Sequence, residues 1–285
     1  MQNSPTVVNE VRSLIKAVDL VLEVLDARAP LSTRNPVIKD LIHTSRNLVL
    51  LNKADLAEEE ITSSWIECFQ DEGFKATLFH NQLPSREIIN FLTQVIPKPQ
   101  KEKFKRPPRI MVLGVPNVGK SSVVNALLQR KSARTGDKAG ITRGKQWIRI
   151  KPGLDLLDTP GLVQPFINEQ TYTRISALGV LPDSQVEPVE VAEWLVNFLF
   201  YRQISERLEE RYGEKLEGRS DPEEILVMIG KKRGCLLGGG EVDIHQAASI
   251  LLKDFREGRL GPISIEKPGE DDNVDSDEDA EEERS

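Results

Sequence analysis

The sequence is poor in cysteine and in aromatic residues, and it lacks any long uninterrupted apolar run. Only two of the 285 residues are cysteines, Cys68 and Cys235, and neither belongs to a C-x-x-C pair. We therefore expect neither a structural zinc site nor a redox dithiol, and we interpret both cysteines as reduced core thiols. No run of about 18 apolar residues offers a membrane span. The first residues resemble neither a secretory signal nor a transit peptide. These absences favour a cytoplasmic protein or, in a eukaryote, one of the mitochondrial or plastid matrix.

What is present is the composition of a globular chain with an acidic end. Hydrophobic residues make up 39% and charged residues 29%, which is ordinary for a soluble domain. The formal net charge is -7, but residues 266–285 hold eleven Asp/Glu and two Lys/Arg, a net of -9, which leaves +2 for residues 1–265. Such a segment cannot bury enough apolar surface to fold, so we expect a disordered acidic tail over residues 266–285.

Short runs rich in Val, Ile and Leu predict six strands within the first 160 residues. The runs are Asp19–Leu25, Asn47–Leu51, Lys75–Phe79, Arg109–Leu113, Lys145–Ile150 and Leu154–Leu157. Helical patterns alternate with several of them, over Val8–Val18, Asn35–His43, Glu58–Glu72, Ser85–Val95 and Lys120–Arg130. This alternation predicts an α/β fold with a mostly parallel, six-stranded, doubly wound sheet. The turn at Pro152-Gly153 predicts one antiparallel hairpin between the last two strands.

Beyond about residue 170 the strand patterns stop and helical patterns continue. They cover Pro188–Tyr201, Ile204–Tyr212, Asp221–Ile229 and Ile244–Glu257. Ser220-Asp221-Pro222-Glu223 is a typical helix start, because it combines a capping residue, a proline in the first turn and acids near the positive end. We therefore expect an α/β domain over residues 1–170 and an all-helical domain over residues 171–265.

The most specific motif is a phosphate-binding loop at Gly114–Ser121. The segment reads G-V-P-N-V-G-K-S and fits G-x-x-x-x-G-K-[ST] between a predicted strand and a predicted helix, the context that the motif requires. Its backbone N–H groups and the helix N-terminus would face the phosphates. Lys120 would neutralise the β- and γ-phosphates, and the Ser121 hydroxyl would bind Mg²⁺.

Two further segments predict the remainder of a phosphate site. Asp158-Thr159-Pro160-Gly161 follows a predicted strand; Asp158 would hold Mg²⁺ through water, and the Gly161 N–H would contact the γ-phosphate. Thr142 lies in the polar loop Gly140-Ile141-Thr142, where a first switch that senses Mg²⁺ and the γ-phosphate belongs. We therefore assign Lys120, Thr142 and Gly161 to catalysis and Ser121, Thr142 and Asp158 to Mg²⁺.

Asn52-Lys53-Ala54-Asp55 follows the second predicted strand and has the N-K-x-D pattern of a guanine-binding loop. The Asp55 carboxylate would accept two N–H bonds from guanine, whereas adenine would leave it unpaired. Asn52 would tie this loop to the phosphate loop, and the Lys53 stem would cover the base. The complete set of predicted nucleotide-binding residues is Asn52, Lys53, Asp55, Asn117, Val118, Gly119, Lys120, Ser121, Ser122 and Gly161. Together these motifs predict binding and hydrolysis of GTP.

The order of the motifs is unusual, because N-K-A-D precedes the phosphate loop, whereas conventional GTPases place it last. In this the sequence resembles the circularly permuted GTPases, and within them the bacterial ribosome-biogenesis GTPase A type with its mitochondrial GTPase 1 relatives. The segments that carry the resemblance are D-A-R-A-P at 26–30, S-T-R-N-P at 32–36, R-T-G-D at 134–137, R-G-C at 233–235 and G-G-E-V at 239–242. The resemblance implies a Ras-like P-loop domain, a helical RNA-contacting domain over residues 171–265, and binding to the precursor of the large ribosomal subunit.

Two groups that GTPases use for hydrolysis are missing from their expected places. Leu162 stands where Ras-like enzymes have a water-orienting Gln. The resemblance also implies an N-terminal F-P-G-H-M segment, and Asn3 falls near the place of its His. We therefore expect slow intrinsic turnover, stimulated by ribosomal particles. Asn117 stands where some GTPases that lack the Gln bind K⁺, so we expect K⁺ as a possible second cation.

Three functional hypotheses follow. The first is a GTPase that assembles the large ribosomal subunit. We expect it to be a monomer, with GTP or GDP and the large-subunit precursor and its ribosomal RNA as partners and no membrane contact. The second is a GTP-dependent switch that acts on a protein partner without RNA. The third is a nucleotide-binding module with negligible turnover.

Overall fold

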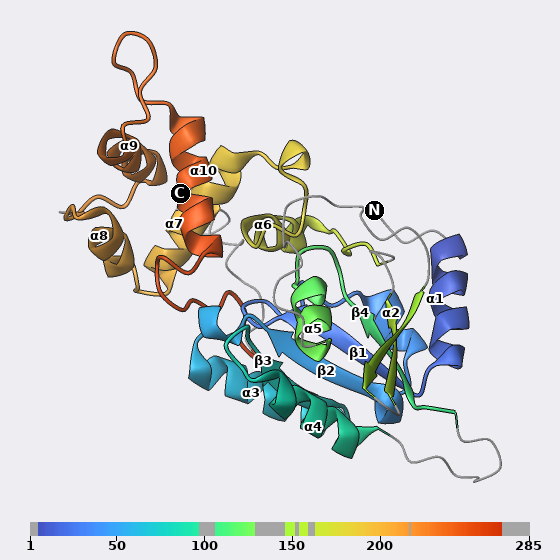
Figure 1. The fold of residues 1–285 in the computed structure, drawn as a ribbon. Helices are drawn as coiled ribbons and strands as arrows, with labels where there is room; N and C mark the ends of the chain where they lie inside the picture. The colour runs from blue at the N-terminus through green and yellow to red at the C-terminus, as the bar shows by residue number, and fades with distance from the viewer. Residues whose placement is uncertain are drawn as a thin grey trace, which may run out of the picture. The chain divides into compact units, whose positions relative to one another are not determined.

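The computed structural model describes residues 5–96, 106–128, 146–151, 154–158, 163–216 and 218–269 (Figure 1). The chain divides into two compact units. The first, which we call the sheet unit, comprises residues up to Ile167 together with Ser264–Pro268. The second, the helical unit, comprises Asn168–Ile263 and, of the described residues that follow, Gly269. The Asn168–Ile263 part is flanked on both sides in the sequence by segments of the sheet unit.

The sheet unit is built on the predicted six-stranded sheet, with the strand order β3-β2-β1-β4-β6-β5. The strands are β1 Leu20–Asp26, β2 Asn47–Asn52, β3 Lys75–Phe79, β4 Arg109–Leu113, β5 Gln146–Lys151 and β6 Leu154–Asp158. All neighbouring pairs are parallel except β5 and β6, which form the predicted antiparallel hairpin. The predicted bounds differ from these by one residue at most.

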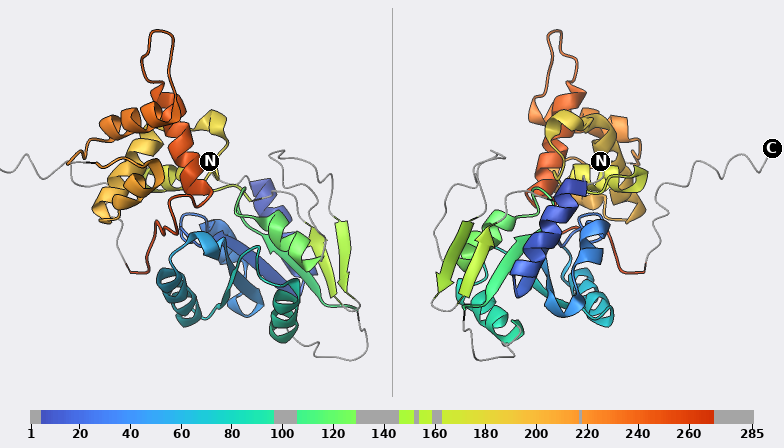
Figure 2. Two further views of the ribbon diagram at one scale, coloured as in Figure 1. Left: turned by 60° about the vertical axis from the view of Figure 1, so that its left-hand side comes forward. Right: turned by 90° about the vertical axis from the view of Figure 1, so that its right-hand side faces the viewer.

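Every residue of β1 and β2 is buried. Because successive side chains of a strand point to opposite faces, both faces of the sheet are covered at its centre. The covering helices are α1 Pro5–Ala17, α2 Pro36–Leu41, α3 Glu59–Asp71, α4 Ser85–Val95 and α5 Lys120–Leu127 (Figures 1 and 2). Trp65 and Phe69 of α3, for example, join Val49 and Leu51 of β2 in one apolar cluster.

The helical unit contains α6 Glu169–Ala177, α7 Pro188–Tyr201, α8 Glu206–Tyr212, α9 Pro222–Arg233 and α10 Ile244–Arg256. Helices α7, α9 and α10 contact one another, and α6 contacts α7 and α10. The predicted start of α9 is confirmed, and its cap is Asp221, whose side chain accepts a hydrogen bond from the Glu223 N–H. The buried Asp254 of α10 accepts hydrogen bonds from Arg211 and Tyr212, which links α8 to α10.

The sequence interpretation was wrong about two features of the helical unit. It did not predict α6, which begins at a capping box formed by Asn168 and Thr171. It also ended α9 at Ile229, whereas the helix continues through Gly230 to Arg233 and stops at Gly234, which has a left-handed φ of 70°. Glycine is needed inside the helix because a Cβ on Gly230 would lie 2.3 Å from Val242 Cγ1.

The described residues contain no helix long and apolar enough to cross a membrane. Cys235 is buried as expected for a core thiol, whereas Cys68 is only half-buried. Glu266, the first residue of the predicted tail, is buried within the sheet unit, so the ordered body extends to Pro268 at least.

Candidate nucleotide site

The predicted guanine loop and phosphate loop lie at the carboxyl end of the parallel strands. Asp26, the last residue of β1, is opposite Asn52, the last of β2, which is opposite Phe79, the last of β3. Strand β4 ends at Leu113, immediately before the phosphate loop. Ligands of open α/β sheets bind at this edge, so the sheet alone brings the guanine motif and the phosphate motif together although they are about 60 residues apart.

The phosphate loop has a backbone that its sequence explains. A Cβ on Gly114 would lie 2.4 Å from the Val24 carbonyl oxygen, so only glycine fits there. Asn117 and Gly119 have left-handed φ angles of 59° and 92°, and helix α5 begins at Lys120. The loop thus turns into a helix N-terminus, whose free N–H groups and positive dipole end attract an anion.

The two reactive side chains of the motif occupy the first turn of α5. Lys120 Nζ donates a hydrogen bond to the Val115 carbonyl oxygen at 2.6 Å, so its amine lies over the loop that would hold the phosphates. Burial lowers the pKa of Lys120 to about 8, because the charged form loses hydration there. Ser121 is exposed and Ser122 is half-buried. A half-buried amine that has no acidic partner among the described residues suits a phosphate.

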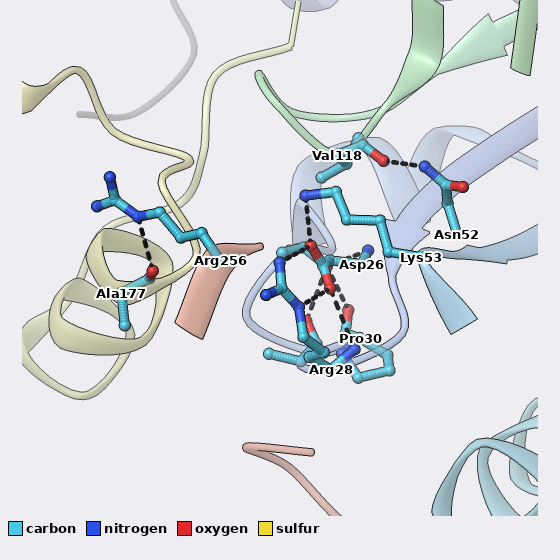
Figure 3. Close-up of polar contacts among 10 residues, drawn as sticks. Asp26, Arg28, Pro30, Asn52, Lys53, Val118, Ala177 and Arg256 are labelled. Carbon is cyan, nitrogen blue, oxygen red and sulfur yellow. Dashed lines mark hydrogen bonds and ion pairs between the residues drawn. The ribbon is translucent and has the colours of Figure 1, made fainter. Parts of the chain in front are cut away.

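The guanine loop is tied directly to the phosphate loop. Asn52 Nδ2 donates a hydrogen bond to the Val118 carbonyl oxygen at 2.6 Å (Figure 3). The approach is so close that a Cβ on Gly119 would lie 2.0 Å from Asn52 Nδ2. Glycine at 119 is therefore required both by its φ and by the Asn52 amide. Asn52 thus ties the two loops together as the sequence predicted, while its part in nucleotide binding stays a prediction.

Lys53 and Asp55 complete the guanine loop. Lys53 has a left-handed φ of 59°, and Asp55 is exposed in the short 3₁₀ turn Ala54–Leu56 that follows. Lys53 Nζ lies 2.8 Å from Oδ2 of Asp26, a residue that sequence reasoning did not assign to the site.

Asp26 is fully buried and joins two cations (Figure 3). Its carboxylate accepts hydrogen bonds from Arg28 Nε and Nη2, both at 2.9 Å, in addition to the ion pair with Lys53. Burial alone would raise the pKa of Asp26, but the charges of Arg28 and Lys53 and their hydrogen bonds hold it well below its usual range. The carboxylate therefore stays ionised and fixes the direction of the Lys53 side chain.

In the loop after Asp26, each of the four polar residues of the S-T-R-N segment at 32–35 makes a hydrogen bond or an ion pair. Thr33 Oγ1 accepts a hydrogen bond from the Asp26 N–H, and Arg34 forms a buried bidentate pair with Glu23. Asn35 caps α2 and donates to the Gln164 carbonyl oxygen at 2.8 Å. Ser32 donates to the Glu266 carboxylate from both its N–H and its hydroxyl.

Several predicted site residues lie outside the part that the structure describes. These are Thr142 and Gly161, together with Leu162. Asp158 is placed as the last residue of β6, at the same edge of the sheet, but its side chain is not described. The structure thus brings together Asn52, Lys53, Asp55 and the phosphate loop, while the assignments of Thr142, Gly161 and the Asp158 carboxylate stay predictions.

The geometry agrees with what this chain resembles. A family model described as a 50S ribosome-binding GTPase matches residues 109–216. Ribosome biogenesis GTPase A of Bacillus licheniformis is 38% identical over 279 residues, which span 91% of this chain and 94% of the relative. Mitochondrial ribosome-associated GTPase 1 of Bos taurus is 31% identical, with 90% of this chain and 85% of the relative covered. The GNP-bound structure of YlqF from T. maritima is 27% identical with a TM-score of 0.66, covering 92% of this chain and 98% of that one. The chain therefore belongs to the family of ribosome biogenesis GTPase A and mitochondrial ribosome-associated GTPase 1.

Proposed function

We propose that this protein binds and hydrolyses GTP and acts as an assembly factor for the large ribosomal subunit. The observation that carries the proposal is the hydrogen bond between Asn52 and Val118, which joins a guanine loop to a phosphate loop in permuted order. The family relationship supplies the ribosomal target. Its partners are GTP or GDP and a large-subunit precursor with its RNA, and the proposed location is the cytoplasm or an organelle matrix.

Guanine selectivity rests on Asp55 in this proposal. The exposed carboxylate accepts two N–H bonds from the guanine edge, and the Lys53 stem, held by Asp26, lies along the base. Adenine would leave a desolvated carboxylate without donors, which is the kind of mismatch that gives strong discrimination.

Mg²⁺ fits the residues that the structure describes, because the exposed Ser121 hydroxyl in the first turn of α5 is an oxygen donor of the type that this hard cation prefers. Ser121, Thr142 and Asp158 would hold it. The bound ion offsets the charge that develops on the phosphates. Asn117, an exposed residue of the phosphate loop, is the proposed contact for K⁺.

Turnover by the isolated protein is proposed to be slow and to rise on large-subunit particles. Leu162 has no polar group with which to orient water. The chain leaves the second switch, Asp158–Gln164, directly into the helical unit, whose residues 171–265 we propose to contact RNA. Movement of that switch with the γ-phosphate is thereby linked to the helical unit through the backbone.

The direct test is GTP turnover by the purified protein alone and with large-subunit precursors. We expect a slow basal rate, on the order of 10⁻⁴ to 10⁻² per second by comparison with unassisted GTPases, and a clear increase with precursors. The Lys120→Ala variant, whose circular dichroism should equal that of the wild type, should show neither the basal turnover nor the increase with precursors. Turnover that precursors do not change would favour a switch for a protein partner, and no turnover under any condition would favour a binding module.

A further inference from the structure

Basic charge is concentrated in one stretch of the chain. Residues 98–151 contain fifteen lysines and arginines and two acidic residues, a net of +13. The helical unit, residues 168–263, contains twelve basic and seventeen acidic residues, a net of -5. Clustered Lys and Arg are the electrostatic signature of a nucleic-acid contact, so the sheet unit carries a basic region of its own for binding a polyanion, in addition to the contact proposed for the helical unit.

The described part of this stretch includes the edge strand β5. It is the outermost strand on its side of the sheet (Figure 2). Trp147 and Arg149, two residues apart, point to the same face of the strand. The Trp147 residue is 41% exposed and the Arg149 side chain 67% exposed. The indole ring and the neighbouring guanidinium are therefore both accessible to a ligand.

A further cation, Arg109, borders the indole ring. The Arg109 guanidinium of β4 lies 4.3 Å from the Trp147 ring centroid and so stacks on the ring. Its Nε is buried and finds no acceptor among the described residues. Among the described residues, the acid that pairs with these cations is Asp155, at 3.3 Å from Arg149 Nε, so the patch formed with the two arginines keeps a net positive charge.

We propose that this face, formed by Arg109, Trp147 and Arg149, binds single-stranded RNA. An unpaired base stacks on the accessible part of the Trp147 ring, which the Arg109 guanidinium holds in place, and the adjoining phosphates contact Arg149. The combination of a basic surface with an exposed aromatic ring is the recognition mode of single-stranded nucleic acid. The inference rests on the proposed function only in taking ribosomal RNA as the natural source of that strand.

The test is a titration with a ten-nucleotide oligo(A) RNA. Binding is monitored by tryptophan fluorescence, and the affinity is measured separately by filter binding. Stacking of a base on Trp147 should quench its emission, whereas linear polyphosphate of similar length should not. Trp147→Ala should weaken RNA binding by about fivefold to 150-fold, as loss of a stacking residue does. Trp147→Phe should keep most of the affinity but lose the quench. Tyr201→Ala is the matched control, since Tyr201 is another exposed aromatic, 62% accessible, in the helical unit.

The salt dependence separates the two kinds of contact. Arg149→Ala should reduce the slope of log affinity against log salt by about 0.7, the value for one phosphate on a single strand, and Trp147→Ala should leave the slope unchanged. Equal binding by the wild type and Trp147→Ala, or equal quenching by polyphosphate, would overturn the inference. Quenching by a peptide of residues 270–285 but not by RNA would also overturn it. The same variants are also sedimented with large-subunit precursors. The proposed function fails only if the wild-type protein does not bind these precursors, so the two results can be told apart.

Discussion

The hydrogen bond between the two nucleotide loops allows a sharp prediction for Asn52→Asp. The replacement has the same shape, but an ionised carboxylate cannot donate to the Val118 carbonyl oxygen 2.6 Å away. Asn52 is buried, so water cannot take the place of the lost donor. An unsatisfied buried acceptor costs about 1–3 kcal/mol, which corresponds to an affinity for GDP weaker by about fivefold to 150-fold. We expect this loss at pH 8, measured by calorimetric titration.

The pH dependence of the same variant tests the reasoning further. Burial and the facing carbonyl raise the pKa of the new carboxyl group, and its protonated form is again a donor. Affinity for GDP should therefore partly recover at pH 5.5 in Asn52→Asp. It should not recover in Asn52→Ala, which has no donor at any pH. If Asn52→Asp binds GDP as tightly as the wild type at pH 8, the hydrogen bond does not join the two loops in solution.

Three other predictions concern the same site. Asp55→Asn should weaken GTP binding and shift preference toward xanthine nucleotides, in a competition titration that compares GTP with XTP; unchanged GTP affinity would remove Asp55 from the site. Burial lowers the pKa of Lys120 to about 8 in the free protein, and bound phosphates raise this pKa again. Above pH 8 the binding of GDP must therefore be accompanied by protonation of Lys120. The affinity for GDP should fall by about tenfold from pH 7 to pH 9. A flat profile would show that Lys120 is not the phosphate partner. Hydrolysis should be faster in K⁺ than in Na⁺, and Asn117→Ser should reduce that difference more than it reduces GTP affinity, whereas equal rates in the two salts would leave Asn117 a structural residue.

Much of the sheet unit could be predicted from the sequence because its signals are local. Buried parallel strands are short apolar runs with loop residues on both sides, as in Asn47–Asn52 and Arg109–Leu113. The phosphate loop is a fixed spacing of glycines before a helix. The pairing of Asn52 with Val118 followed from the motif, since each loop leaves the carboxyl end of a parallel strand.

Contacts between distant polar residues could not be predicted in the same way. Asp26 ends an apolar strand, but only the folded chain shows that Lys53 and Arg28 both pair with it. Glu266 reads as one more acid of the tail, yet its carboxylate accepts hydrogen bonds from the backbone of Leu31 and Ser32. Both interactions depend on tertiary geometry, for which charge and periodicity carry no signal.

The two errors in the helical unit have local causes. The Glu169–Ala177 helix was missed because its weak apolar pattern hides the capping signal of Asn168 and Thr171. Helix α9 was predicted too short because a glycine inside a helical pattern reads as a stop, whereas Gly230 makes room for Val242.

The most direct test of the account is co-sedimentation of the protein with precursors of the large ribosomal subunit. The account predicts that the protein travels with these particles in the presence of a non-hydrolysable GTP analogue, releases them in GDP, and fails to bind them in either nucleotide when it carries Lys120→Ala. Binding that is the same in the analogue and in GDP, or no binding in the analogue, would contradict the claim that GTP controls its association with the large subunit.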